Sequence, residues 1–103
     1  MSRINLNDTI LRADNLLSTE LEDQIMLMGI DRGKYYGLDA VGSRIWTLME
    51  QPVKVRDLCD SLCAEYSVSP QQCEQDVIGF LNKLYSEKMI KRESGPNIVG
   101  GSR

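Results

Sequence analysis

Two amphipathic segments joined by a very short connection constrain the fold more than any other feature of this 103-residue sequence. In the first segment, apolar residues recur every three or four positions, as they do on one face of a helix. They are Val55, Leu58, Cys59, Leu62, Cys63 and Tyr66. After Ser67-Val68, the second segment begins with Ser69 as an N-cap, Pro70 in the first turn and Gln72 where a capping-box partner belongs. Helices joined this tightly have helix-turn-helix proportions.

The second of these helices is expected to extend to about Glu87. Its buried face would consist of Cys73, Val77, Phe80, Leu81 and Leu84. Val68 and Cys73 are placed to form a hydrophobic staple across the cap. The run from Met89 to Arg92 is short and β-prone, and we expect it to be a wing strand.

The first third of the chain is rich in strand signals. We expect strands at Thr9–Ala13, Asp23–Gly29 and Lys34–Leu38, and a loop at Asp14–Glu22. The last two strands should form a hairpin, because Gly33 lies where the turn needs a positive φ. Asp39 is a suitable N-cap for a helix over 40–50, with Trp46 beside its apolar stripe and Pro52 beyond its end.

The predicted order is therefore β-β-β-α-α-α-β, an α+β winged helix-turn-helix in which the hairpin and the terminal strand supply the winged sheet. With 42% hydrophobic and 26% charged residues, the chain has a globular composition. We expect one domain at 1–92 and a disordered Gly-, Ser- and Pro-containing tail at 93–103. No signal peptide is visible, and the apolar run at Ile25–Gly29 is too short to span a bilayer, so a cytoplasmic protein is expected.

Most catalytic chemistry is disfavoured by the residue types. The chain has no histidine, which removes the commonest general base and metal ligand. Gly29, Gly33, Gly37 and Gly42 are spaced wrongly for a phosphate-binding loop. The sequence therefore predicts a protein that is not an enzyme and needs no cofactor.

Three cysteines, Cys59, Cys63 and Cys73, are an odd number in a chain without a secretion signal, which favours reduced thiols. Three thiolates hold zinc only with a fourth ligand, and no histidine or CxxC pair supplies one. Small buried core residues are the favoured interpretation. A metal or redox sensor remains an alternative.

A DNA-binding regulator is a second alternative, in which the third helix would read a groove. The net charge of −3 argues against it, because phosphate contacts supply most of the affinity for DNA. Only Lys83 and Lys88 are basic on this helix, and Asp76 lies among its outer positions. Those outer positions are Gln71, Gln72, Glu74, Gln75, Gly79 and Asn82.

The remaining candidate is strand addition to a sheet edge, where unpaired N–H and C=O groups can template a peptide. If Lys34–Leu38 is an edge strand opposite the third helix, the two would form a groove. Of Tyr35 and Tyr36, one should point into the core and the other outward. The expected peptide-binding residues are Lys34, Tyr35, Tyr36, Gly37, Cys73, Asp76, Val77, Phe80, Lys83 and Leu84. A free edge also permits a weak dimer as well as a monomer.

The run from Gly33 to Trp46 resembles the signature of the peptide-chaperone family named for protein D of pyrroloquinoline quinone biosynthesis. Its marks are Tyr-Gly-Leu38, then Asp39, Val41-Gly42 and Ile45-Trp46. Three later segments also fit, and the resemblance covers about Thr9 to Arg92. These segments are Val55–Leu58, Glu65–Val68 and Asp76–Leu81 with Leu84.

The resemblance implies a RiPP recognition element, which binds the leader of a ribosomally made precursor peptide for a partner enzyme. In that family the leader adds a strand beside the third strand and packs on the third helix. The free-standing size, the long loop before the second strand, and Cys73 after Ser-Pro-Gln-Gln most resemble the lasso-peptide branch. There a separate leader peptidase receives the precursor and a cyclase acts afterwards. A chaperone of the quinone pathway is the alternative.

Two positions depart from the family pattern. Lys54 stands before the second helix where Thr or Ser is usual, which weakens that cap. Gly79 lies within the third helix, where glycine costs about 1 kcal/mol relative to alanine. We expect Gly79 either to reflect this cost or to permit a close backbone approach.

Overall fold

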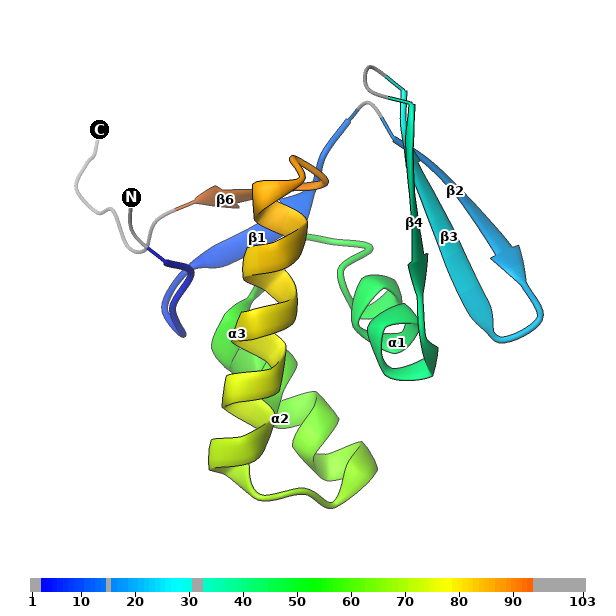
Figure 1. Ribbon diagram of the computed structural model, residues 1–103. Coiled ribbons are helices and arrows are strands. Elements are labelled where there is room, and N and C mark those ends of the chain that lie inside the picture. Colours follow the sequence, from blue (N-terminus) through cyan, green and yellow to red (C-terminus); the bar gives the residue numbers. More distant parts are fainter. Residues whose placement is uncertain (1–2, 15, 31–32, 94–103) are drawn as a thin grey trace.

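A computed structural model describes residues 3–14, 16–30 and 33–93 of the chain. It confirms the α+β winged helix-turn-helix class (Figure 1). The elements in chain order are β1 (Thr9–Arg12), β2 (Leu16–Leu21), β3 (Gln24–Gly29), β4 (Lys34–Leu38), α1 (Ala40–Leu48), β5 (Val53–Lys54), α2 (Val55–Tyr66), α3 (Pro70–Ser86) and β6 (Ile90–Glu93). Apart from Glu93 in β6, the expected disordered tail lies outside the described residues.

The strands form two separate sheets, in the orders β5-β1-β6 and β2-β3-β4. The expected hairpin is confirmed as β3 and β4, in which Leu27 pairs with Tyr36. Gly33 has the predicted positive φ of 65°, and its N–H donates to the carbonyl of Gly29 at 2.8 Å.

Two sequence-based expectations about the strands were wrong. Six residues of the expected loop at Asp14–Glu22 form β2, and all six pair with β3. Three of them are leucine, so this segment is less polar than the expected loop required. The terminal strand also does not share a sheet with the hairpin. β6 instead pairs with β1, bringing Thr9 opposite Glu93.

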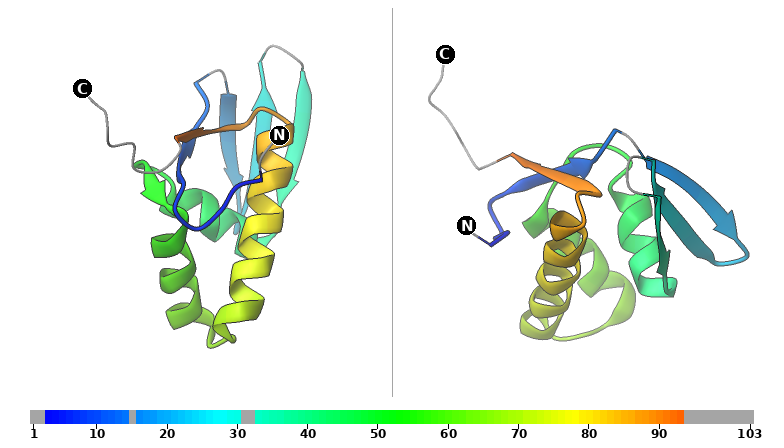
Figure 2. Two further views of the ribbon diagram at one scale, coloured as in Figure 1. Left: turned by 90° about the vertical axis from the view of Figure 1, so that its left-hand side faces the viewer. Right: turned by 45° about the horizontal axis from the view of Figure 1, so that its top comes forward.

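Helix α1 lies between the β2-β3-β4 sheet and the α2-α3 pair (Figure 2). Its predicted cap is confirmed, since the Asp39 carboxylate accepts from the Gly42 N–H at 2.8 Å. At the start of α3, the Ser69 hydroxyl accepts from the Gln72 N–H at 3.2 Å. Both helix starts therefore follow from local sequence.

Helix α2 begins without a side-chain cap from Lys54, as its sequence suggested. The N-terminal segment satisfies the helix instead, because the Val55 and Arg56 N–H groups donate to the carbonyls of Asp8 and Leu6 at 3.0 and 3.1 Å. The N-terminus of α2, which has no side-chain cap of its own, is thus capped by backbone carbonyls of the N-terminal segment.

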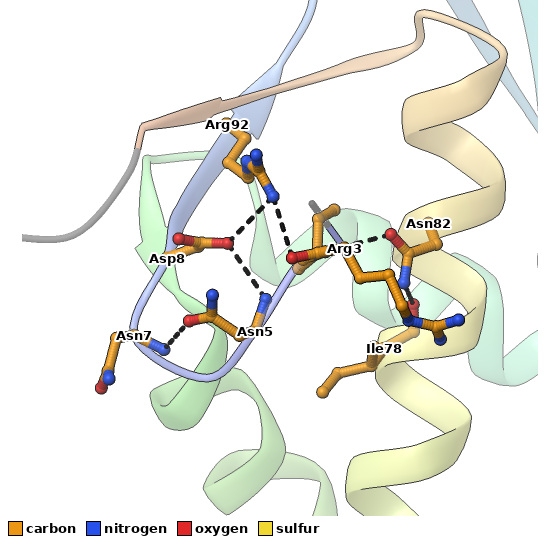
Figure 3. Close-up of polar contacts among 8 residues, drawn as sticks. Arg3, Asn5, Asn7, Asp8, Ile78, Asn82 and Arg92 are labelled. Atoms are coloured by element: carbon orange, nitrogen blue, oxygen red, sulfur yellow. Dashed lines mark hydrogen bonds and ion pairs between the residues drawn. The ribbon is translucent and has the colours of Figure 1, made fainter. Parts of the chain in front are cut away.

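A network of polar contacts holds that N-terminal segment in place (Figure 3). The buried Asp8 carboxylate accepts from the Asn5 N–H at 3.0 Å and lies 3.4 Å from the Arg92 guanidinium. The Asn82 side chain on α3 accepts from the Ile4 N–H at 3.1 Å. These contacts join the chain's start to α3 and β6.

The core lies where α1, α2 and α3 meet the inner faces of both sheets. Its largest fully buried side chains include Ile10, Leu27, Leu58, Leu81 and Leu84. Trp46, expected beside the apolar stripe, is buried, and the Arg12 guanidinium lies 4.6 Å from its ring centroid. In the described part of the chain, no helix is long and apolar enough to cross a bilayer.

Candidate functional site

Strand β4 is an edge of the β2-β3-β4 sheet, which was the condition for a binding groove at Lys34–Leu38. Among the described residues, its only strand neighbour is β3. Its other side faces α3 across the molecule (Figure 1). One row of β4 backbone groups is therefore left without a strand partner.

The two tyrosines of β4 point to opposite faces of the sheet, as expected. Tyr36 lies opposite the buried Leu27 and packs against the core. Tyr35 lies on the outer face and is 69% exposed. Tyr36 is thus the tyrosine directed toward the helices.

Side-chain contacts connect β4 to α3 and its C-cap residue Glu87, and we name this region the β4–α3 seam. The Lys34 ammonium lies 3.0 Å from the Glu87 carboxylate. The Lys83 ammonium lies 5.4 Å from the centroid of the Tyr36 ring. Both contacts are at exposed or half-exposed side chains, so each contributes little to stability and can yield to a bound strand.

A cavity of about 380 Å³ opens at the far end of this seam, next to the end of β4. We name it the end pocket. Its lining is mostly apolar and comes from α1 and its cap, α2, α3 and the α2–α3 connection. The lining residues are Asp39, Val41, Gly42, Ile45, Leu62, Tyr66, Val68, Cys73, Asp76, Val77 and Phe80.

Gly42 and Phe80 fix the shape of the end pocket. A Cβ on Gly42 would lie 3.1 Å from the Phe80 ring and 3.2 Å from the Asp39 carboxylate. Glycine therefore lets α1 approach the aromatic side chain of α3. Gly79, where a close approach was one expectation, has no atom within 4 Å of such a Cβ.

The sequence-predicted site residues divide into three groups in the structure, with Leu84 apart from all three. Four of them line the end pocket, namely Cys73, Asp76, Val77 and Phe80. Lys34, Tyr36 and Lys83 form the side-chain contacts of the seam. Tyr35 and Gly37 belong to the outer face, while Leu84 is fully buried and offers no surface.

Sequence reasoning missed the part of the end pocket supplied by α1 and the α2–α3 connection. The Val41-Gly42 pair was noted as a family mark and not as part of the site, because the approach of Gly42 to Phe80 is a tertiary contact. Nothing local pointed to Tyr66 and Val68, because their place depends on how α2 turns into α3.

Two carboxylates, Asp39 and Asp76, lie at the end pocket. Each uses one oxygen locally, Asp39 for the Gly42 N–H and Asp76 for the Gln72 amide at 3.0 Å. Neither forms an ion pair with any residue that the structure describes. The end pocket is thus negative, whereas Lys83 lies at the middle of β4 and Lys34, paired with Glu87, lies at its start.

The three cysteines meet where α2 packs on α3. The Cys73 thiol donates to the Cys59 carbonyl at 3.5 Å, and the Cys63 thiol donates to the Val68 carbonyl at 3.0 Å. Burial raises the pKa of Cys59 to about 12 and also raises the pKa of Cys73. Protonated thiols are poor nucleophiles. The described part of the chain contains no cluster of side chains arranged to hold a metal ion.

The fold and site define a winged helix-turn-helix module with an open sheet edge beside its third helix. The model of the family described as "Coenzyme PQQ synthesis protein D (PqqD)" matches residues 24–90. The chain belongs to this family, which confirms the resemblance of residues 33–46. Members of the family are non-catalytic peptide chaperones, and the chain is accordingly not an enzyme.

A solved structure, TbiB1 in complex with the TbiA(beta) leader peptide, is similar to this chain. The two are 37% identical and superpose with a TM-score of 0.75, over 79% of this chain and 94% of TbiB1. A comparison with the curated proteins gives no match.

Proposed function

We propose that this chain is a RiPP recognition element. It binds the leader of a ribosomally synthesised precursor peptide by strand addition to β4 and delivers that precursor to a processing enzyme. The observation that supports this most is the free edge of β4 beside α3, with the end pocket at its end. The likeness to TbiB1, which was solved with a leader peptide, supports the same assignment.

In strand addition, backbone hydrogen bonds and side-chain contacts make different contributions to binding. Backbone pairing with β4 supplies affinity that depends little on leader sequence. Alternate leader side chains would point toward α3, where the end pocket accepts apolar groups. The other side chains would extend the outer sheet face that carries Tyr35.

Within the family, we assign the chain to the lasso-peptide branch, with a separate leader peptidase as the receiving enzyme and a cyclase acting later. Cys73 after Ser-Pro-Gln-Gln supports this branch. A further feature expected to support it, a long loop before the hairpin, is removed by β2. A chaperone of quinone-cofactor biosynthesis is the alternative within the same family.

Calorimetric titration with the synthetic leader of the precursor encoded beside this chain tests the proposal. We expect saturable binding that changes little between low and high salt, and no binding of a scrambled leader. Absence of binding by the intact leader would overturn the proposal. A steeply salt-dependent complex with DNA from the same locus would support a regulator instead.

The branch assignment has its own test. Leader peptidase and cyclase genes beside this chain, and faster cleavage of the precursor by that peptidase when the chain is added, would support the lasso-peptide branch. A neighbouring set of quinone-cofactor genes would contradict it.

A further inference from the structure

We infer that the end pocket selects a leader segment in which an apolar side chain lies next to a lysine or arginine. This inference rests on the proposed function, and it names the chemistry that the site reads. The occupant is a segment of the leader peptide. Its apolar side chain would enter the end pocket, and its cation would lie against Asp39 and Asp76.

The lining of the end pocket accounts for the apolar part. Phe80, Ile45 and Val77 form its walls, and the volume of about 380 Å³ is near the lower limit of small-ligand sites. A pocket of that size accepts one or two side chains and not a folded segment. Val41, Tyr66 and Val68 are 40–46% exposed around it, so a bound leader would bury further apolar area.

The two carboxylates account for the cation. They come from different elements, Asp39 from the start of α1 and Asp76 from α3, and both line one cavity. No lysine or arginine is part of that lining. A cation from the leader would meet two negative charges beside apolar walls, where charges attract more strongly than in bulk water.

Position along β4 ties this preference to strand addition. Asp39 directly follows Leu38, the last residue of β4, so a strand paired along β4 reaches it in register. The rest of the seam carries Lys83 over the Tyr36 ring and the Lys34–Glu87 ion pair, and offers no pair of carboxylates. A leader bound in reverse would lose the contact of its cation with Asp39 and Asp76 and bring that cation toward Lys83. The change in charge along the seam therefore disfavours the wrong direction as well as favouring the right one.

The test is a display library of the leader encoded beside this chain, with each position varied to every amino acid and selected on the full-length protein. The test variants are Asp39→Asn with Asp76→Asn, and the matched control is Asp60→Asn, an exposed carboxylate of α2 outside the end pocket. Asparagine still caps α1, so the fold should be retained.

Wild type and the control should enrich lysine or arginine beside one apolar leader position. The double variant should lose that enrichment and bind the wild-type-selected peptides about tenfold more weakly, because two ion pairs are removed. A single Asp76→Lys variant should instead enrich aspartate or glutamate at the same leader position. Misfolding of the Asp76→Lys variant could weaken leader binding, but it could not create this new preference for acidic leader residues.

Two negative outcomes have different meanings. The inference is overturned, and the proposed function stands, if wild type recovers leaders without a preference for lysine or arginine. The same holds if the double variant keeps full affinity and the Asp76→Lys variant gains no preference for aspartate or glutamate. If the starting leader is not retained by any variant or by wild type, the proposed function fails as well.

Discussion

The two sheets of this molecule differ in how much apolar side-chain surface they expose. Both have a buried central strand, with Ile10 of β1 and Leu27 of β3 fully buried. Hydrogen bonds also attach both to the helices, since the Val55 N–H donates to the Asp8 carbonyl and the Ile25 N–H donates to the Ser43 hydroxyl. In the β2-β3-β4 sheet, however, Leu17 and Leu21 of β2 are 52% and 60% exposed, and Tyr35 of β4 is 69% exposed. The described strands of the β5-β1-β6 sheet carry no exposed large apolar side chain.

This difference indicates which sheet is available to a partner. Exposed apolar side chains beside an open sheet edge favour aggregation unless a partner covers them. β4 combines such an edge with a nearby helix and a cavity. We conclude that both sheets contribute buried strands to the core, whereas the second also presents the binding strand.

The largest expected effect is the difference in stability between truncating a buried strand residue and truncating an exposed one. Ile10→Ala should lower the free energy of unfolding by about 3–4 kcal/mol, because it leaves a cavity in the core. Leu17→Ala, at an exposed position of β2, should change it by less than about 0.5 kcal/mol. Urea denaturation measures both, and equal losses would contradict the conclusion that the apolar surface of β2 is left free for a partner.

The next effect concerns binding. Phe80→Ala should weaken leader binding by about 1–3 kcal/mol, because the ring forms a wall of the end pocket. Tyr85→Ala is the matched control, an aromatic residue of the same helix that contacts Arg92 and lies outside the pocket. Calorimetry should show a change below about 0.5 kcal/mol for this control. Unchanged affinity in the Phe80 variant would mean that the groove is misplaced.

Substitutions at two glycines, one on the free surface of α3 and one in the packed end pocket, should have different effects. Gly79→Ala should raise the free energy of unfolding by up to about 1 kcal/mol, because a Cβ there meets nothing and alanine favours the helix. Gly42→Ala should give no such gain and should weaken leader binding, since the new Cβ displaces Phe80. Thermal unfolding and calorimetry separate the two, and similar behaviour of both variants would refute the role of Gly42.

The smallest effect at neutral pH is that of Cys59, which belongs to the α2–α3 core beneath both sheets. Burial raises the pKa of its thiol from 9.0 to about 12, so the folded chain keeps a proton that the unfolded chain loses. Its contribution is therefore present below pH 9 and is lost as the pH rises from 9 to 12. Denaturation across this range should show a shallower fall for Cys59→Ala than for wild type. Parallel curves would contradict the raised pKa.

Sequence alone predicted the parts of this fold that local chemistry determines. Periodic apolar residues and the caps at Asp39 and Ser69 placed the helices, and Gly33 placed the β3–β4 turn. The strand β2 was missed because it depends on pairing with β3 and not on its own composition. The division into two sheets was missed for a similar reason, since β1 pairs with β6 from the far end of the chain.

The candidate site was predicted only in part, for the same physical reason. Phe80 and Asp76 were found because they lie on a recognisable helix opposite an edge strand. Their partners Gly42 and Val41 come from another helix, and only the tertiary contact of Gly42 with Phe80 brings them together. Leu84 was placed on the expected apolar face, but that part of the face is fully buried.

The most direct test of the central claim is amide hydrogen exchange of β4, measured by NMR with and without the leader peptide. A strand added to β4 should slow the exchange of those β4 amides that face away from β3, while β1 and β6 change little. Slowed exchange limited to α3, with β4 unchanged, would mean that the leader binds without strand addition. That result would contradict the assignment of β4 as the binding strand.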